Sequence, residues 1–202
     1  TTEAALDLDG GTLTANYGPA GSVAFAAEMD DFTWPEEAEF GIAVQASRRL
    51  LVAADIKWIG WSQAIDVVKI KPSGGPAGVP APVTPGSDAL LFNMNWDDQW
   101  VYALGVEYAI NPMHTIRLGY NYGKSPVPDA NLSPLFPAIV EHHLTFGYGL
   151  TLDKWAFDLA YEHAFENTQT NNNPDPLTNP FGPGVSVSQA QHTVHGSVTY
   201  FF

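Results

Sequence analysis

Apolar side chains occupy every second position through long stretches of this chain. Between residues 155 and 165 the odd positions are large and mostly aromatic, whereas the even positions are Ala, Asp, Ala, Glu and Ala. The same alternation runs through 143–150 and 193–202. A helix would space its apolar residues three and four apart, whereas a strand turns successive side chains to opposite faces. The pattern therefore predicts β-strands with one apolar and one polar face.

Further segments repeat this alternation and predict an all-β, antiparallel protein. Eight or nine strands are expected, over about 11–17, 21–29, 37–46, 50–61, 96–110, 114–123, 143–150, 155–165 and 193–202. Several of them reach the ~10 residues that a tilted strand needs to cross a membrane. Strands of soluble domains average only about five or six residues.

Alternation fits both a soluble β-sandwich and a transmembrane β-barrel, which turns its apolar face to lipid. Two features favour the barrel. The chain stops in Thr199-Tyr200-Phe201-Phe202, which looks like the terminal aromatic signal of outer-membrane proteins. Large aromatic residues also gather on the apolar face near strand ends, as in an interfacial girdle: Trp96, Trp100, Tyr102, Tyr108, Tyr120, Tyr122, Trp155, Tyr161 and Tyr200.

The connections between the expected strands alternate in length. The short ones lie at 47–49, 111–113 and 152–153, and the long ones, rich in Pro, Gly, Asn and Asp, at about 71–95, 124–140 and 167–188. Short periplasmic turns and long outer loops are typical of outer-membrane barrels. We therefore expect a multi-pass protein of a Gram-negative outer membrane, with its C-terminus in the periplasm.

Composition excludes several classes of function. The chain has no Cys, and its 8 Lys+Arg against 22 Asp+Glu give a net charge of −14, so the basic footprint of a nucleic-acid-binding protein is missing. His192 and His195 point to opposite faces of a strand, as do His142 and His143, which argues against a metal site. Because the sequence carries no catalytic motif, we expect neither an enzyme nor a cofactor.

Four segments, in this order, resemble the FadL-type outer-membrane transporters of long-chain fatty acids and aromatic hydrocarbons. Together they span about 35–165, and they include Leu51-Val52-Ala53-Ala54-Asp55-Ile56-Lys57-Trp58 with Trp61-Ser62, Trp96-Asp97-Asp98, Thr115-Ile116-Arg117-Leu118-Gly119-Tyr120, Ser125-Pro126-Val127-Pro128-Asp129 and His143-Leu144-Thr145-Phe146-Gly147-Tyr148-Gly149. The resemblance implies a fourteen-stranded barrel with an N-terminal hatch, and passive transport of hydrophobic small molecules.

The chain has fewer strands than that barrel and offers no segment for a hatch. We therefore expect residues 1–202 to form a single transmembrane region, the C-terminal portion of a monomeric barrel surrounded by outer-membrane lipid. Two alternatives stay open. A complete eight-stranded barrel would leave almost no lumen for a substrate. A small structural or adhesive barrel would act through its extracellular loops.

The expected lumen face carries charges that can be paired by registering each hairpin on its short turn. This register sets Glu107 opposite Arg117, Glu39 opposite Lys57, and His143 opposite Glu162. Opposed charges across two strands stabilise them by roughly 0.2–1 kcal/mol each. Arg117 and Lys57 are also candidates to meet a fatty-acid carboxylate, and Trp61 is an apolar candidate for substrate contact. Asp158 and Glu162 are expected to point inward, and the aromatic residues between them outward.

Overall fold

The computed structural model describes residues 5–83, 86–175, 178–179 and 181–202. Nearly all regular secondary structure of the described chain is strand: β1 (Ala5–Asn16), β2 (Ser22–Thr33), β3 (Glu36–Ser47), β4 (Leu50–Gly60), β5 (Val67–Ser73), β6 (Leu90–Asn93), β7 (Gln99–Ala109), β8 (His114–Gly123), β9 (His142–Leu152), β10 (Trp155–Asn171) and β11 (Val185–Tyr200). Three single-turn helices interrupt them: η1 (Gly18–Ala20), α1 (Trp61–Ala64) and η2 (Asp129–Asn131). No helix in the described ranges is long and apolar enough to cross a membrane.

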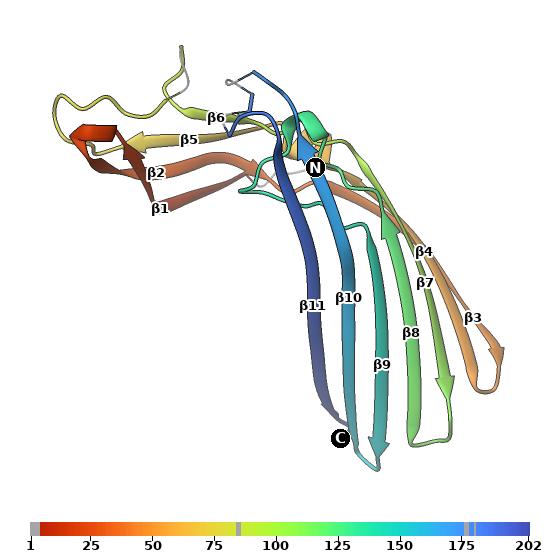
Figure 1. Ribbon diagram of the computed structural model, residues 1–202. Helices are drawn as coiled ribbons and strands as arrows, with labels where there is room; N and C mark the ends of the chain where they lie inside the picture. The colour runs from red at the N-terminus through yellow and green to blue at the C-terminus, as the bar shows by residue number, and fades with distance from the viewer. Residues whose placement is uncertain (1–4, 84–85, 176–177, 180) are drawn as a thin grey trace.

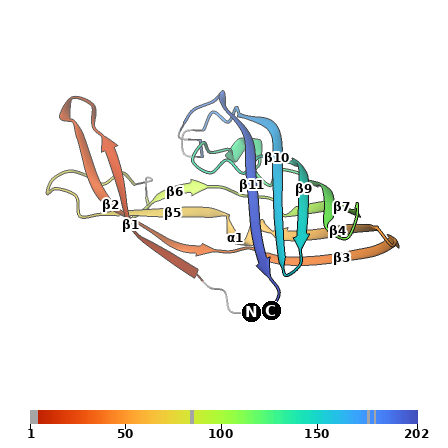
Figure 2. The ribbon, with the colours of Figure 1, turned by 90° about the horizontal axis from the view of Figure 1, so that it is seen from below.

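Seven long strands form one antiparallel sheet in the order β11-β10-β9-β8-β7-β4-β3. This sheet, which we call the wall, curves into an arc (Figures 1 and 2). Its edge strands are β11 and β3, and within the described residues β11 pairs with β10 alone. Residues 21–29 and 189–202 therefore do not pair with each other, and in the described chain the wall is an open, curved sheet rather than a closed eight-stranded barrel.

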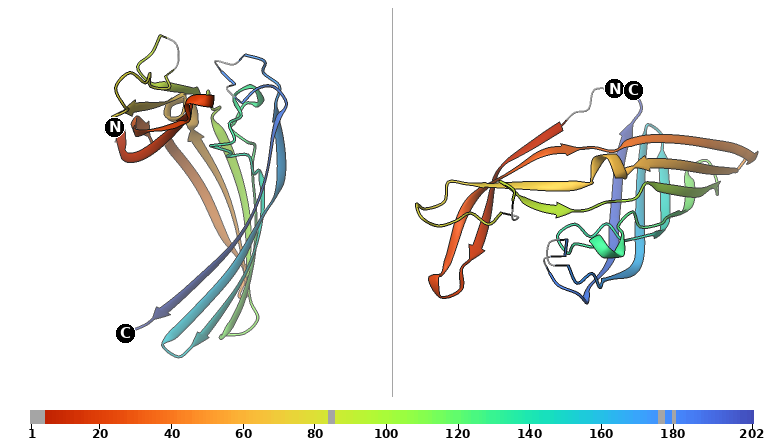
Figure 3. Two further views of the ribbon diagram at one scale, coloured as in Figure 1. Left: turned by 60° about the vertical axis from the view of Figure 1, so that its left-hand side comes forward. Right: turned by 90° about the horizontal axis from the view of Figure 1, so that it is seen from above.

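The remaining strands form a second antiparallel sheet in the order β1-β2-β5-β6. It lies beside the end of the wall that is farther from the C-terminus (Figures 1 and 3). The two sheets are continuous along the chain. Strand β2 leads into β3, and β4 leads into β5, so the β3–β4 pair continues beyond a bend as the β2–β5 pair. Trp34 and Pro35 make the bend on one strand, where proline offers no N–H to the ladder. On the other strand, helix α1 makes the bend between β4 and β5.

This second sheet explains why the described residues contain eleven strands rather than the eight or nine expected. The segments expected at 11–17 and 21–29 are strands, but they belong to the second sheet. The segment 71–95, expected as a connection, contains the end of β5 and all of β6. The connection expected at 167–188 is shorter, because β10 continues to Asn171 and β11 begins at Val185. The loop near 124–140 and the turns after β3 and β7 lie where the sequence predicts them, whereas the β9–β10 turn lies one residue later than expected.

The two faces of the wall differ as the alternation predicts. One face exposes its large apolar residues, including Leu104 at 61% and Leu159 at 59%. The other face carries the charges, and there Asp158 contacts Arg117 and Glu162 contacts His143. The inward position of both carboxylates is thus confirmed. Trp96 departs from the expected girdle, because it is only 6% exposed and packs among the loops instead.

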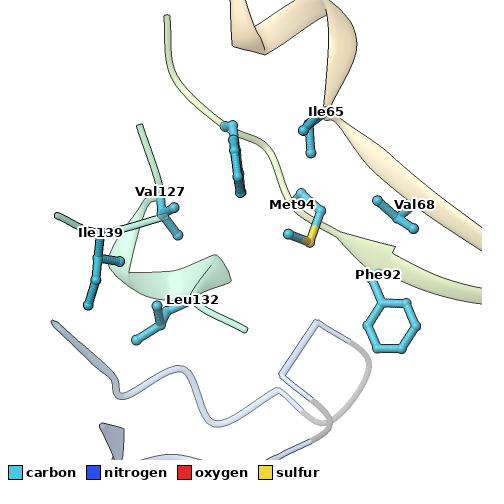
Figure 4. Packing of buried hydrophobic residues seen from close by; sticks show 8 residues of the cluster. Ile65, Val68, Phe92, Met94, Val127, Leu132 and Ile139 are labelled. Carbon is cyan, nitrogen blue, oxygen red and sulfur yellow. The ribbon is translucent and has the colours of Figure 1, made fainter. Parts of the chain in front are cut away.

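The buried core sits at one end of the wall. Its members lie in β5 and β6, in the segments that flank these two strands, and in the β8–β9 loop: Ile65, Val68, Phe92, Met94, Trp96, Val127, Leu132 and Ile139 (Figure 4). We call this assembly the cap. The wall has no such core of its own, because its large apolar side chains lie on an exposed face. The loops instead bury their apolar side chains against one another, which holds them in a fixed arrangement.

Candidate functional site

A cavity of about 710 Å³ lies where the cap meets the polar face of the wall. That volume is within the range of roughly 300–1,000 Å³ that is usual for small-molecule sites. Its lining is largely carbon and comes from many elements: Met29, Trp34, Trp61, Ile65, Trp96, Gln99, Val101, Asn121, Gly123, Pro126, Phe136, Pro137, Ala138, Val140, Glu141, His143, Gln189 and Gln191. The cavity is the best-formed candidate site among the described residues.

Strand parity explains which wall residues reach the cavity. Gln99 and Val101 are alternate residues of β7, Asn121 and Gly123 are alternate residues of β8, and all four point to the polar face. His143 and Gln191 reach the cavity from β9 and β11 in the same way. Gln99, Asn121, His143 and Gln191 thus supply polar groups to the cavity, as do Glu141 and Gln189.

The β8–β9 loop supplies apolar surface, and side-chain amides of β10 hold it in place. Gln169 donates to the carbonyl of Val127 at 2.6 Å, and Asn171 donates to the carbonyls of Ala130 and Leu132 at 3.1 Å each. Asn167 likewise donates to the carbonyl of Ile139 at 2.7 Å. Backbone carbonyls in a buried loop need such partners. The loop therefore lies firmly across the polar face.

Two tryptophans form the opposite side of the cavity. Trp61 packs edge-on against Trp96 with ring centroids 5.2 Å apart, and its indole nitrogen donates to Gln99 at 3.2 Å. Next to it, the Ser62 hydroxyl donates to Asp98 at 2.7 Å and fixes α1 to the start of β7. Trp61 was expected at the end of a strand on the lumen face. It lies instead in α1, since β4 ends at Gly60, but it does reach the lumen side.

Below the cavity the polar face of the wall is charged. The Arg117 Nε donates to Glu107 at 2.7 Å, and its Nη1 donates to Asp158 at 2.5 Å. The expected register, with Glu107 opposite Arg117, is confirmed. Asp158 lies two strands away, and Gly147 and Gly149 on β9 leave the space across which the guanidinium reaches it.

A second cation is held in the same way. Lys57 lies opposite Glu39, as expected, and its ammonium contacts Glu39 at 3.1 Å and Glu37 at 3.4 Å. Exposed pairs of this kind contribute roughly 0–1 kcal/mol each, because water screens them. Neither Lys57 nor Arg117 lines the cavity.

The expected register of the β9–β10 hairpin is wrong by two residues. Glu162 lies opposite Thr145 rather than His143, since the turn is formed by Asp153 and Lys154. Asp153 has φ +51°, a left-handed conformation that Asp tolerates and that a two-residue hairpin turn requires. The His143 Nδ1 nevertheless reaches Glu162 diagonally, at 2.9 Å.

A sequence model for outer membrane protein transport proteins (OMPP1/FadL/TodX) matches residues 3–201. This chain belongs to that family. No curated protein sequence matches it at a significant level. Membership places the chain among the β-barrel proteins of the Gram-negative outer membrane, in which the polar face of the wall would be the lumen face.

Solved structures of the FadL/TodX type share the fold. The Pseudomonas putida toluene transporter TodX superposes with a TM-score of 0.69 at 24% identity, over 97% of this chain and 42% of its own. The Ralstonia pickettii toluene transporter TbuX gives 0.64 at 20% identity, over 97% and 41%. A Pseudomonas aeruginosa FadL homologue gives 0.62 at 21% identity, over 89% and 38%. The chain thus spans about two fifths of the length of these relatives.

In this member of the FadL/TodX family, most apolar residues of the cavity lie in segments that strand alternation cannot assign. Phe136, Pro137 and Ala138 fall in an expected loop, and Ile65 follows an expected strand. One signal was present in the sequence: the loop contains the unusually apolar run Leu135-Phe136-Pro137-Ala138-Ile139-Val140. A solvated loop has little reason to carry such a run, so it indicates a buried surface.

Within the described ranges, no group of three or more His, Asp or Glu side chains is placed to hold a metal ion. An apolar cavity with few polar groups binds hydrophobic molecules through the area that they remove from water.

Proposed function

We propose that this chain forms part of a channel through which hydrophobic small molecules pass the outer membrane passively. The observation that carries the proposal is the apolar cavity of about 710 Å³, fixed between the cap and the lumen face of the wall. A hydrophobic compound would leave the medium by binding there and would then move on into the barrel. The family description and the two related toluene transporters support this direction.

The proposal includes an orientation and a residue role. The cap and the long loops face the medium, and the short turns and the C-terminus face the periplasm, as is usual for outer-membrane barrels. Trp61 contacts the substrate, because its ring lines the cavity beside Trp96. Arg117 and Lys57 would have to release their carboxylates before they could meet a substrate.

Filling the cavity tests the proposal. Ala138 lines it, and Ala138→Trp should lower the uptake of radiolabelled 1-hexadecanol by a Gram-negative host that lacks its own channels of this family. The chain is expressed with any sequence that flanks it in its gene. Leu135→Trp is the matched control, since Leu135 lies on the same loop, is 57% exposed and does not line the cavity.

Uptake should fall toward the level of the host alone for Ala138→Trp and stay near wild type for Leu135→Trp. Equal uptake with both variants, at wild-type barrel levels in the membrane, would contradict a route through the cavity. Uptake by the wild-type protein no greater than that of the host alone would reject channel function and favour a structural or adhesive barrel.

A further inference from the structure

Cations are missing from the cavity. Among the described residues that line it, no Lys or Arg occurs, and the only acid is Glu141. The Glu141 carboxylate accepts a hydrogen bond from the backbone N–H of Ser125 at 2.9 Å. His143, the lining residue that could become cationic, is already in contact with Glu162. Among the described lining residues, a carboxylate entering the cavity would therefore meet no Lys or Arg to pair with it.

The lumen face below the cavity is acidic as well. Within the described strands it carries two cations, Lys57 and Arg117, each already shared between two carboxylates. The acids on this face outnumber them: Glu37, Glu39, Asp55, Glu107, Asp158 and Glu162. Clefts lined by one sign of charge focus the potential and exclude ions of the same sign.

The other cations do not line the cavity, and two of them, Lys69 and Lys71, belong to β5 of the second sheet. Arg48 and Arg49 form the β3–β4 turn, and Lys154 belongs to the β9–β10 turn, so all three are at the end of the wall opposite the cap. Lys124 follows the lining residue Gly123, but it is exposed and not part of the lining.

We infer that this half of the channel selects uncharged hydrophobic compounds against carboxylates of the same size. The inference rests on the proposed function and names its substrate class. Transferring an unpaired carboxylate from water into an apolar cavity costs far more than transferring a hydroxyl, which the amides of Gln99 and Asn121 in the lining can hydrogen-bond, and a hydrocarbon has no polar group to desolvate. A long-chain alcohol or a hydrocarbon therefore enters readily, and the fatty-acid anion of equal length does not.

A matched pair of substrates tests this selectivity. Radiolabelled 1-hexadecanol and palmitate have chains of equal length and differ in the charge of the head group. They are given at pH 7.5 to a host that lacks its own channels of this family and cannot metabolise either compound. Wild-type protein should raise the initial uptake of hexadecanol at least about tenfold more than that of palmitate, the lower end of the range expected for electrostatic focusing.

A cation placed in the lining should reduce the difference in uptake between hexadecanol and palmitate. Asn121 lines the cavity, and no hydrogen bond of its side chain to a described residue is found, so Asn121→Lys adds a charge with little loss of structure. This variant should reduce the hexadecanol-to-palmitate ratio by about tenfold, the order expected for one charge pair in a partly solvated site. Asn121→Met, similar in size but uncharged, should leave the ratio unchanged. If Asn121→Lys fails to reach the membrane, Gln191→Lys with Gln191→Met repeats the comparison.

The outcomes separate this inference from the proposed function. Equal uptake of both compounds by wild-type protein overturns the selectivity while leaving the channel intact. A selective loss of palmitate uptake in Arg117→Lys also overturns it, because Arg117 would then meet the carboxylate. Uptake of neither compound above the level of the host rejects the channel itself.

Discussion

Two glycines on β9 determine how far the Arg117 side chain reaches along the wall. A Cβ added at Gly149 would lie 2.9 Å from Asp158 Oδ1 and 3.2 Å from Arg117 Nη1, and one at Gly147 would lie 3.3 Å from the Cβ of Arg117. Any larger residue would occupy the path across β9. Because these glycines are present, one guanidinium joins carboxylates from β7 and β10 and ties four neighbouring strands together on the lumen side.

We predict that Gly149→Val destabilises the barrel. Its side chain should displace Asp158 from Arg117, at a cost of up to about 1 kcal/mol, since both partners are partly exposed to water. The midpoint of urea unfolding in detergent measures the change. Gly105→Val is the control, because Gly105 faces the same lumen and has no heavy atom within 4 Å of an added Cβ. Equal midpoints for the two variants would show that the Arg117–Asp158 contact contributes nothing.

At the scale of elements, a bulge in β10 changes which residues the upper strand turns inward. Ala164 pairs with Gln191, but the next paired residue is Asn167 with Gln189, so the alternation shifts between them. Bulges re-aim side chains in this way. Above it, Asn167, Gln169 and Asn171 point to the lumen and bind the β8–β9 loop. On one side of the bulge β10 is part of the wall, and on the other side its side chains hold the β8–β9 loop of the cap in place.

Asn171→Asp should loosen the attachment of the β8–β9 loop to β10. Asn171 is 1% exposed, and its amide donates to two carbonyls that a carboxylate can only repel. Leaving buried carbonyls unpaired costs roughly 1–3 kcal/mol each. We expect chymotrypsin to cleave the loop near Phe136 faster in the variant, as followed by mass spectrometry. Thr170→Val, which removes only an exposed hydroxyl contact to Ser186, should cleave at the wild-type rate. Unchanged cleavage in Asn171→Asp would mean that the cap core holds the loop unaided.

The whole molecule has two unlike ends. The cap, its core and the second sheet lie at one end of the wall, while the two-residue turns and the C-terminus lie at the other (Figures 1 and 3). Strand length and the outward apolar face suit a membrane crossing between them. The proposed orientation follows from this polarity, with the cap exposed to the medium.

The absence of Cys from the chain allows a direct test of that orientation. Ala77 is exposed in the β5–β6 connection, and Lys154 is exposed in the β9–β10 turn. In intact cells, a membrane-impermeant maleimide should label Ala77→Cys and spare Lys154→Cys. The second variant should react only after the outer membrane is permeabilised, as monitored by a gel shift. The reverse order of labelling would contradict this orientation and would place the cap in the periplasm.

The sequence by itself determined the strands of the wall, their two faces, and two of the three hairpin registers. These follow from period-two alternation and from turn length, both of which are local properties of the chain. The pairs Glu107–Arg117 and Glu39–Lys57 could therefore be predicted from residue numbers alone. The third register failed because a left-handed Asp153 moves the turn by one residue, and loop length does not reveal that conformation.

Only the tertiary structure decided the cap and the cavity. Trp96, Phe136 and Ile139 look like loop or girdle residues in a local reading, yet they meet residues that are far away in the chain. Nothing periodic marks such segments, because their partners come from several loops at once and their burial depends on the curvature of the wall. The same holds for Arg117 and Asp158, which lie 41 residues apart and are joined only because two strands pair with β9 at its glycines. Local alternation specifies strands, whereas contacts between loops and across several strands arise only when the whole sheet has formed.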